Sequence, residues 1–263
     1  MTDNTAAPGP ALPTQLREMT AIVTGGASGI GLDIARDLAR QGCRVAIWDR
    51  NADALQRASG SLRTEGLDVI TETLSVTSED EVSHAVAKLM GQTGRIDILV
   101  NNAGIGGDRL MAKMDLSFWQ RVIDTNLTSQ FICCKAVAPH MVAQGFGRII
   151  NISSRAWLGN RGQASYSASK GGVVSFTRSL ALEYARNGIT ANAIAPGIIE
   201  TPLFETITDK VKDDLKRSVP VQRIGQPSDV AEAVRFFAQP GASYITGQLL
   251  YVCGGRSLSS PSV

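Results

Sequence analysis

The strongest constraint on the fold is a regular alternation of short apolar runs with helical patterns. Apolar residues recur at helical spacing in Ile30, Ile34 and Leu38, and again within residues 82–89. Between such patterns lie seven runs that are typical of buried strands, at residues 21–23, 45–48, 69–74, 96–100, 148–152, 189–194 and 248–252. Strands that alternate with helices form a parallel sheet with helices on both faces. We therefore predict an α/β fold with a doubly wound, seven-stranded parallel sheet.

The same alternation predicts one domain rather than two. No linker-like stretch interrupts it, and α/β domains of about 250 residues are common. Residues 1–16 are rich in Ala, Pro, Thr and Gly and show no periodicity. We predict a mobile tail at residues 1–16, a single domain at 17–256 and a second tail at 257–263.

Charge and hydropathy exclude several classes of partner. The 26 Lys and Arg residues nearly balance the 24 Asp and Glu residues, and no basic block of five or six residues occurs. The sequence therefore lacks the electrostatic pattern of a nucleic-acid or membrane-surface partner. No apolar run approaches the roughly 18 residues of a membrane span, and the first residues do not resemble a secretory signal. We expect a cytoplasmic protein that binds neither nucleic acid nor membrane.

The cysteines do not form a recognisable metal or redox motif. Cys43, Cys133, Cys134 and Cys253 include no C-x-x-C pair, and the chain has only two histidines. Metal sites built from Cys and His need several such residues at fixed spacing. We predict free thiols that pack as small hydrophobic groups, and no metal site.

A glycine-rich turn follows the first strand and opens the first helix. Gly25 permits a tight turn, Gly29 lets the backbone approach a pyrophosphate, and Gly31 allows close packing of helix and strand. The helix N-terminus, with Ser28 and Ile30, offers N–H groups to phosphates. A merely flexible turn is the alternative, but the strand-turn-helix context favours a dinucleotide site.

A carboxylate stands where a dinucleotide site reads the adenosine ribose. Asp49 ends the second strand, eighteen positions after Gly31, where its carboxylate can accept hydrogen bonds from both ribose hydroxyls. Its charge would repel a 2′-phosphate, so Asp49 predicts NAD rather than NADP. The adjacent Arg50 could meet that phosphate, and Asp49 could instead be a solvated carboxylate at a strand end.

Tyr166 and Lys170 lie one turn apart on one face of a predicted helix, with Cβ atoms about 5–6 Å apart. An adjacent ammonium stabilises a phenolate, and a phenol whose pKa falls from about 10 toward neutrality is a usable acid or base. A Tyr/Lys pair at this spacing is also common as a structural feature. The pair therefore gains meaning only from its surroundings.

Those surroundings comprise four further motifs, Asn101-Asn102-Ala103-Gly104, Thr125-Asn126-Leu127, Ser153-Ser154 and Pro196-Gly197. Together with the glycine-rich turn and the Tyr166/Lys170 pair, they make the chain resemble the short-chain dehydrogenase/reductase family over about residues 18–255. The resemblance implies one Rossmann-type domain that both binds a dinucleotide and carries out catalysis.

The resemblance also implies catalytic roles. Ser154 would hydrogen-bond the substrate oxygen, and Tyr166 would transfer the proton. Lys170 would lower the pKa of Tyr166 and bind the nicotinamide ribose, and Asn126 would hold a water that relays protons from Lys170 to solvent. A purely structural Asn126 is the alternative, because Asn readily bonds nearby backbone.

Further cofactor contacts follow from the same resemblance. Asn102 would lie beside the ribose, Gly104 would permit close approach, and Ser75 would meet the adenine where the family usually has an acidic residue. The Ile199 backbone and the Thr201 hydroxyl would bind the carboxamide. The remaining contacts are expected from Val76, Ala103, Pro196 and Gly197.

Two positions near the predicted site stay ambiguous. Counted from Tyr166, Ser153 matches the family's catalytic serine, whereas counted from the strand Ser154 does. We favour Ser154, because strand alternation fixes which side chain faces the cleft and a loop tolerates a deletion. Trp157 either floors the substrate pocket or packs the loop.

These features predict an NAD(H)-dependent oxidoreductase that interconverts a secondary alcohol and a ketone. An NADPH-dependent reductase of 3-oxoacyl thioesters and a non-catalytic dinucleotide-binding regulator are the alternatives. Residues 202–222 correspond to a cover over the substrate in the family, and their mixed apolar and charged pattern suits a small apolar ketone.

The resemblance further implies a homotetramer, built through the helices that carry Asn126 and Tyr166 and through the last strand. Apolar residues on those helices are candidates for the contacts, namely Phe131, Ile132, Phe176 and Leu180. The alternative is that these four residues are buried in the core of a single chain.

Overall fold

The computed structural model describes residues 13, 15–200 and 208–258. Its centre is one parallel sheet in the order β3-β2-β1-β4-β5-β6-β7. The predicted doubly wound α/β fold is therefore confirmed, and each strand lies within about two residues of its predicted position. The strands are β1 (Thr20–Thr24), β2 (Arg44–Asp49), β3 (Val69–Thr73), β4 (Ile98–Asn101), β5 (Gly147–Ile152), β6 (Ile189–Pro196) and β7 (Leu249–Val252).

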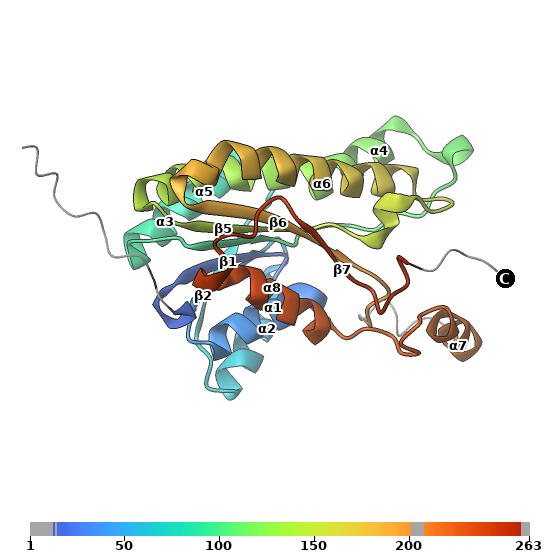
Figure 1. The fold of residues 1–263 in the computed structure, drawn as a ribbon, viewed down its shortest axis with the longest axis horizontal. Coiled ribbons are helices and arrows are strands. Elements are labelled where there is room, and N and C mark those ends of the chain that lie inside the picture. Colours follow the sequence, from blue (N-terminus) through green and yellow to red (C-terminus); the bar gives the residue numbers. More distant parts are fainter. Residues whose placement is uncertain (1–12, 14, 201–207, 259–263) are drawn as a thin grey trace, which may run out of the picture.

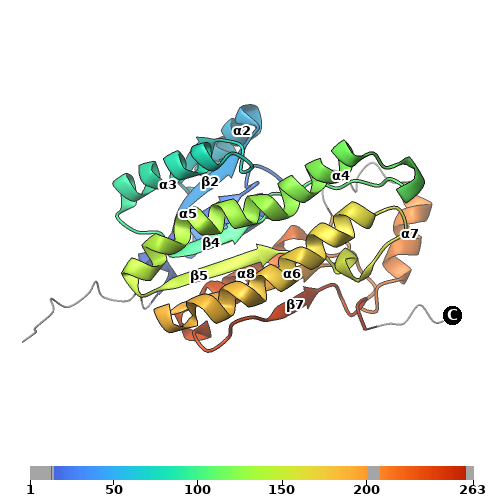
Figure 2. The same ribbon diagram turned by 90° about the horizontal axis from the view of Figure 1, so that it is seen from above.

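Helices cover both faces of this sheet (Figures 1 and 2). One layer contains α1 (Gly29–Arg40), α2 (Ala52–Thr64) and α8 (Pro227–Ala238), and the other contains α3 (Glu79–Thr93), α5 (Ser129–Gln144) and α6 (Ala164–Tyr184). The short helix α4 (Leu116–Ile123) packs beside α6. Helix α7 (Asp209–Arg217) lies beyond the carboxyl ends of the strands, at the right of Figure 1.

The alternation of side chains along each strand divides the core in two. In β2, Val45 and Ile47 pack with α1, α2 and α8, whereas Ala46 and Trp48 pack on the opposite face with α3, α5 and α6. A strand that is buried on both faces has no polar positions to alternate with apolar ones. This explains why the strands read as continuous apolar runs in the sequence.

Two of the four predicted intersubunit residues belong to the core of the chain. Ile132 and Leu180 are buried in the layer of α3, α5 and α6, and Phe176 packs against it. Only Phe131 is exposed, at 49%. The helical apolar pattern could not separate these outcomes, because it shows that a face is covered but not by what.

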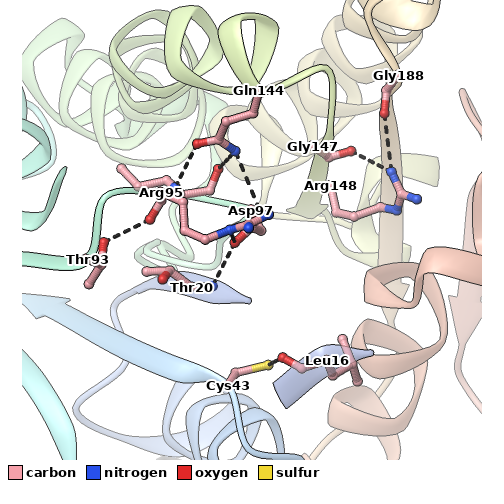
Figure 3. Close-up of polar contacts among 11 residues, drawn as sticks. Leu16, Thr20, Cys43, Thr93, Arg95, Asp97, Gln144, Gly147, Arg148 and Gly188 are labelled. Atoms are coloured by element: carbon pink, nitrogen blue, oxygen red, sulfur yellow. Dashed lines mark hydrogen bonds and ion pairs between the residues drawn. The ribbon is translucent and has the colours of Figure 1, made fainter. Parts of the chain in front are cut away.

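The amino edge of the sheet is closed by a buried polar network (Figure 3). The fully buried Asp97 accepts hydrogen bonds from the Thr20 backbone N–H at 2.9 Å and from Arg95 at 2.7 and 2.8 Å. Nearby, the Arg148 guanidinium donates to carbonyls of Gly147 and Gly188, and burial lowers its pKa to about 10. These bonds join residues in or next to β1, β4 and β5 at this edge, so they serve stability.

The opposite, carboxyl edge is where the topology leaves a crevice. Strand β1 pairs with β2 on one side and with β4 on the other, so the connections leave β1 in opposite directions. In open parallel sheets ligands bind at such a switch point, outside the carboxyl ends of the strands.

The ends of the chain and its thiols add three findings. The 3-10 helix Leu16–Glu18 begins one residue before the predicted start of the domain, and Leu16 packs against the core. Cys43, Cys133 and Cys134 are free and buried as predicted, whereas Cys253 is half-buried. No helix within the described ranges has the length and apolar character needed to cross a membrane.

Candidate active site

Three contiguous cavities run along the carboxyl edge of the sheet. The distal cavity, about 320 Å³, lies between β2 and β3, and the central cavity, about 400 Å³, lies above β1 and β4. The outer cavity, about 540 Å³, is bordered by the segment after β5. The first two share Asp49 and Gly104, and the last two share Ser154, Tyr166 and Gly197. Together they form one long cleft.

The glycine-rich turn lies between the distal and central cavities as expected. Gly25 and Gly29 have φ values of +61° and +52°, which favour glycine. A Cβ on Gly31 would lie 2.2 Å from the carbonyl oxygen of Gly25. Helix α1 therefore packs against the turn only because residue 31 has no side chain.

The first turn of α1 fits an anion. The N-cap Ser28 makes no side-chain hydrogen bond to it, and the turn contains no acidic residue. By contrast α2, α3 and α4 each begin with a capping side chain, from Asn51, Ser78 and Asp115. Helix α1 thus presents uncapped N–H groups and the positive end of its dipole to the central cavity, as a pyrophosphate requires.

Asp49 borders both the distal and central cavities. Its carboxylate accepts from the backbone N–H of Asn51 at 3.0 Å and of Ala27 at 3.4 Å. These bonds hold the charge at the mouth of the distal cavity. Arg50 lines the distal cavity as well and is exposed.

Ser75 and Val76 line the distal cavity, where an adenine was expected. The Ser75 hydroxyl lies 2.8 Å from that of Thr77, and its backbone N–H donates to the Glu81 carboxylate at 2.8 Å. The sequence analysis missed Glu81, which fixes this turn from the first turn of α3. The sequence pattern that could have identified Glu81 is an acidic residue three positions after a serine that caps a helix, here Ser78.

Asn102 bonds to the glycine-rich turn. Its side-chain amide donates to the carbonyls of Thr24 at 3.0 Å and Gly25 at 3.1 Å. The Thr24 hydroxyl in turn accepts from the backbone N–H groups of Asn102 and Ala103. Asn102 therefore holds the glycine-rich turn against β4, and it also lines the central cavity.

Ser153 and Ser154 point to different surroundings. The buried Ser153 hydroxyl donates to the backbone carbonyl of Lys170 at 2.8 Å. Ser154 borders the central and outer cavities together with Tyr166, and a hydrogen bond between their side chains lowers the pKa of Tyr166. Only Ser154 therefore has its hydroxyl beside the phenol.

Tyr166 and Lys170 are both buried, and burial shifts the pKa of each. Burial raises the pKa of Tyr166 above 10, the negative charge of Asp108 raises it further, and the bond to Ser154 only partly opposes them. The Lys170 ammonium lies 5.8 Å from the Tyr166 ring and donates to the Ile152 carbonyl at 2.8 Å. Burial lowers the pKa of Lys170 itself to about 8. Helical spacing placed the two side chains correctly but could not give the degree of burial.

Asn126 is buried in a π-helix, Asp124–Thr128, between α4 and α5. Its side-chain oxygen accepts from the Ile105 N–H at 2.7 Å, and its NH₂ group donates to the Ile105 carbonyl at 3.0 Å and to Ser169 at 3.1 Å. These bonds join the loop after β4 to α6. They use both N–H groups of the amide and one of the two lone pairs of its oxygen.

The far end of the central cavity is formed by Pro196, Gly197 and Ile199, as the sequence predicted. Thr201 and the apolar residues of the expected cover, at 203, 204 and 207, lie outside the described residues. The Trp157 indole donates to the Tyr251 hydroxyl at 2.9 Å, so Trp157 packs its loop against β7.

The outer cavity is more polar than the sequence suggested. Asp108, Arg155, Asn160, Gln163 and Arg256 line it beside Ser154 and Tyr166. None of the five was predicted as a site residue, because they come from three distant segments. Only Arg155 could have been predicted from the sequence to lie near the site, because it directly follows Ser154.

Comparisons with known proteins agree with this geometry. A family model described as enoyl-(acyl carrier protein) reductase matches residues 25–257. A (2S)-[(R)-hydroxy(phenyl)methyl]succinyl-CoA dehydrogenase subunit of Thauera aromatica is 40% identical over 243 residues, 92% of this chain and 98% of that protein. The chain belongs to the short-chain dehydrogenase/reductase family.

Two further relatives support the assignment. A 3-oxoacyl-(acyl carrier protein) reductase of Chlamydia trachomatis is 42% identical over 240 residues, 90% of this chain and 97% of that protein. The structure of an actinorhodin polyketide ketoreductase variant with NADPH has a TM-score of 0.88 and 40% identity, covering 94% of this chain and all of that one. This short-chain dehydrogenase/reductase is thus an oxidoreductase of a family that binds nicotinamide dinucleotides.

Proposed function

We propose that the chain interconverts a secondary alcohol and a ketone with NAD(H). The observation that carries the proposal is the position of Tyr166 and Ser154, which border both the central and the outer cavity. A dinucleotide in the distal and central cavities and a substrate in the outer cavity would meet at these two hydroxyls. The bound dinucleotide supplies or accepts a hydride there.

The chain's own residues would then handle the proton. In the direction of reduction, Ser154 donates a hydrogen bond to the ketone oxygen while the Tyr166 phenol gives up its proton to that oxygen. In the direction of oxidation the phenolate takes the proton from the alcohol. Because burial raises the pKa of Tyr166, its neutral form at pH 7 is the proton donor.

Other residues would bind and orient the cofactor. The uncapped N-terminus of α1 fits the pyrophosphate, and Lys170 borders the central cavity where a ribose would lie. Asn126 holds Ile105, whose loop borders the central and distal cavities. We assign Asn126 a positioning role toward this loop, in addition to the water-holding role that the family resemblance implies.

Asp49 supports NAD as the cofactor. A 2′-phosphate in the distal cavity would face this carboxylate and be repelled by it. The phosphate would also replace the ribose hydroxyl from which the carboxylate can accept a hydrogen bond. We expect NAD to be favoured by about 100-fold in kcat/KM, and Asp49→Ala to reduce that preference at least tenfold. Steady-state kinetics with both cofactors test this, and equal efficiency with NADP would contradict it.

An NADPH-dependent reductase of 3-oxoacyl thioesters is the second candidate. It is favoured by the reductase relative at 42% identity, by the solved relative that holds NADPH, and by Arg50 in the distal cavity. Measuring simple ketones and 3-oxoacyl thioesters, each with NADH and NADPH, separates the two activities. Asp49 favours NADH.

Tyr166→Phe tests whether the site is catalytic. The variant keeps the ring and its packing but lacks the hydroxyl that exchanges the substrate proton, so turnover should fall at least about 100-fold with nearly unchanged affinity for the dinucleotide. A non-catalytic dinucleotide-binding regulator would show no turnover in either protein. Near-normal turnover by the variant would reject the assigned role of Tyr166.

A further inference from the structure

Two arginines from distant parts of the chain meet in the outer cavity. Arg155 directly follows Ser154, and Arg256 follows β7. The Arg155 side-chain Nε donates to the Arg256 backbone carbonyl at 3.3 Å, and both residues line the cavity that Ser154 and Tyr166 border. The fold thus brings two guanidinium groups to the place where the substrate would bind.

Among the described residues that line the outer cavity, two are arginines and one is a carboxylate. Within the described ranges Arg155 forms no ion pair, and Asp108 is the one carboxylate that lines the outer cavity. The Asp108 carboxylate accepts from the Gln163 side chain at 2.6 Å. Burial and the charge of Arg155 together lower the pKa of Arg256. An anion beside the two arginines would relieve this repulsion and receive charge-assisted hydrogen bonds.

The position of Arg155 also limits how far the anion lies from the reacting carbon. Consecutive Cα atoms are about 3.8 Å apart, so the side chain of Arg155 begins next to that of Ser154. A carboxylate a few bonds from the ketone would reach both residues. The phosphates of a thioester carrier would not, because a long pantetheine arm separates them from the reacting carbonyl.

We propose that the outer cavity selects a substrate with a carboxylate close to its ketone or alcohol, and that Arg155 and Arg256 bind this carboxylate. The proposal rests on the proposed function, because Ser154 and Tyr166 must hold the reacting oxygen for the arginines to reach the acid group. It replaces the small apolar ketone that the sequence suggested. Arginine suits the role because its planar guanidinium binds a carboxylate through two parallel hydrogen bonds.

Matched acid and ester substrates test the proposal. The 3-, 4- and 5-oxo carboxylates and their methyl esters present the same ketone with and without the negative charge. We expect the best acid to exceed its ester at least tenfold in kcat/KM. Arg155→Gln should remove most of that preference by raising KM for the acid, while kcat/KM for the ester stays within about twofold. Arg256→Gln should act in the same direction.

The exposed Arg161, which follows the same segment, provides the control. Arg161→Gln has the same charge change and should leave the acid preference intact. Arg155→Lys keeps the charge but not the paired hydrogen bonds, so an intermediate preference is expected, and this variant also serves if Arg155→Gln fails to fold. Circular dichroism and thermal melting establish that each variant is folded.

The outcomes separate this proposal from the proposed function. Turnover of acids and esters with equal efficiency overturns the carboxylate proposal and leaves the function standing. An equal loss for an oxoacyl-CoA thioester in Arg155→Gln would point to phosphate binding and also overturns it. If no ketone is reduced, the proposed function fails, and calorimetry then decides: glutarate should bind the wild type more tightly than Arg155→Gln, and equal binding rejects the carboxylate site.

Discussion

At the scale of single residues, Lys170 shows how burial determines chemistry. It is 3% exposed, and burial lowers its pKa from 10.5 to about 8. Below pH 8 both folded and unfolded chains carry the proton, so the folded state bears the full cost of burying the charge. Between pH 8 and 10.5 the unfolded chain binds more protons than the folded one, and this cost disappears.

Lys170→Met should therefore change the pH dependence of stability. Relative to the variant, the wild type should gain on the order of 1–3 kcal/mol in free energy of unfolding between pH 7 and 10. Urea denaturation at several pH values measures the difference. Lys113→Met, which removes an exposed lysine, should show no such trend. A constant difference for Lys170→Met would mean that its pKa is not lowered.

The two serines after β5 give a second prediction at this scale. Ser154→Ala removes the hydroxyl beside Tyr166, a hydroxyl that also accepts from the Ala156 backbone N–H at 3.1 Å, and we expect kcat to fall at least tenfold. Ser153→Ala removes a buried bond to the Lys170 carbonyl and should instead lower the free energy of unfolding by about 1–2 kcal/mol. The opposite pattern would make Ser153 the catalytic serine.

The sequence could predict those site residues whose positions follow from local geometry. Gly25, Gly31 and the Tyr166/Lys170 pair belong to short motifs, in which spacing along the chain fixes spacing in space. Arg256 meets Arg155 across about a hundred residues, so no local pattern could connect them. The raised pKa of Tyr166 was also beyond the sequence, because it depends on how tightly other segments cover the phenol.

At the scale of elements, the π-helix Asp124–Thr128 was the least predictable segment. It lies between α4 and α5 with no loop on either side, and Leu127 is its one apolar residue. With a single apolar residue, the segment has no periodicity that could indicate the wider turn of a π-helix. Single π-turns often occur at functional sites, and this one turns Asn126 toward the loop after β4.

Asn126→Ala should loosen that loop. The change leaves the Ile105 N–H and carbonyl without their partners, so we expect a loss of about 1–3 kcal/mol in free energy of unfolding and a several-fold higher KM for the dinucleotide. Hydrogen exchange at Ile105 should become faster. Thr128→Ala, in the same π-helix, affects only a 3.4 Å contact with Asp124 and is the control. Unchanged exchange at Ile105 would show that other contacts hold the loop.

At the scale of the whole molecule, the two edges of the sheet have different tasks. At the amino edge, Arg95 donates to the buried Asp97, and the buried Arg148 donates to the backbone carbonyls of Gly147 and Pro240. The carboxyl edge contains the three cavities. Strand-helix alternation predicted the layers, but which buried charges close the amino edge depends on contacts between β1, β4 and β5 that no single segment encodes.

The last prediction concerns assembly. Strand β7 ends the sheet with an open edge, and large apolar side chains are exposed beside it, Leu182 on α6 at 84% and Tyr244 before β7 at 98%. Such groups favour a partner surface. We expect a homotetramer of about four times the 27.9 kDa chain mass by light scattering at micromolar concentration.

Charged substitutions test where the subunits meet. Leu182→Glu combined with Tyr244→Glu should reduce the mass to that of a smaller oligomer, because the new charges would lose water on association. Val211→Glu on α7, 44% exposed and away from the sheet, should leave the mass unchanged. Since both variants alter only exposed positions, their folding should be normal. A monomer mass for the wild type at micromolar concentration would reject assembly altogether, and a tetramer that tolerates the double variant would move the contact to α4 and α5, where Phe131 is exposed.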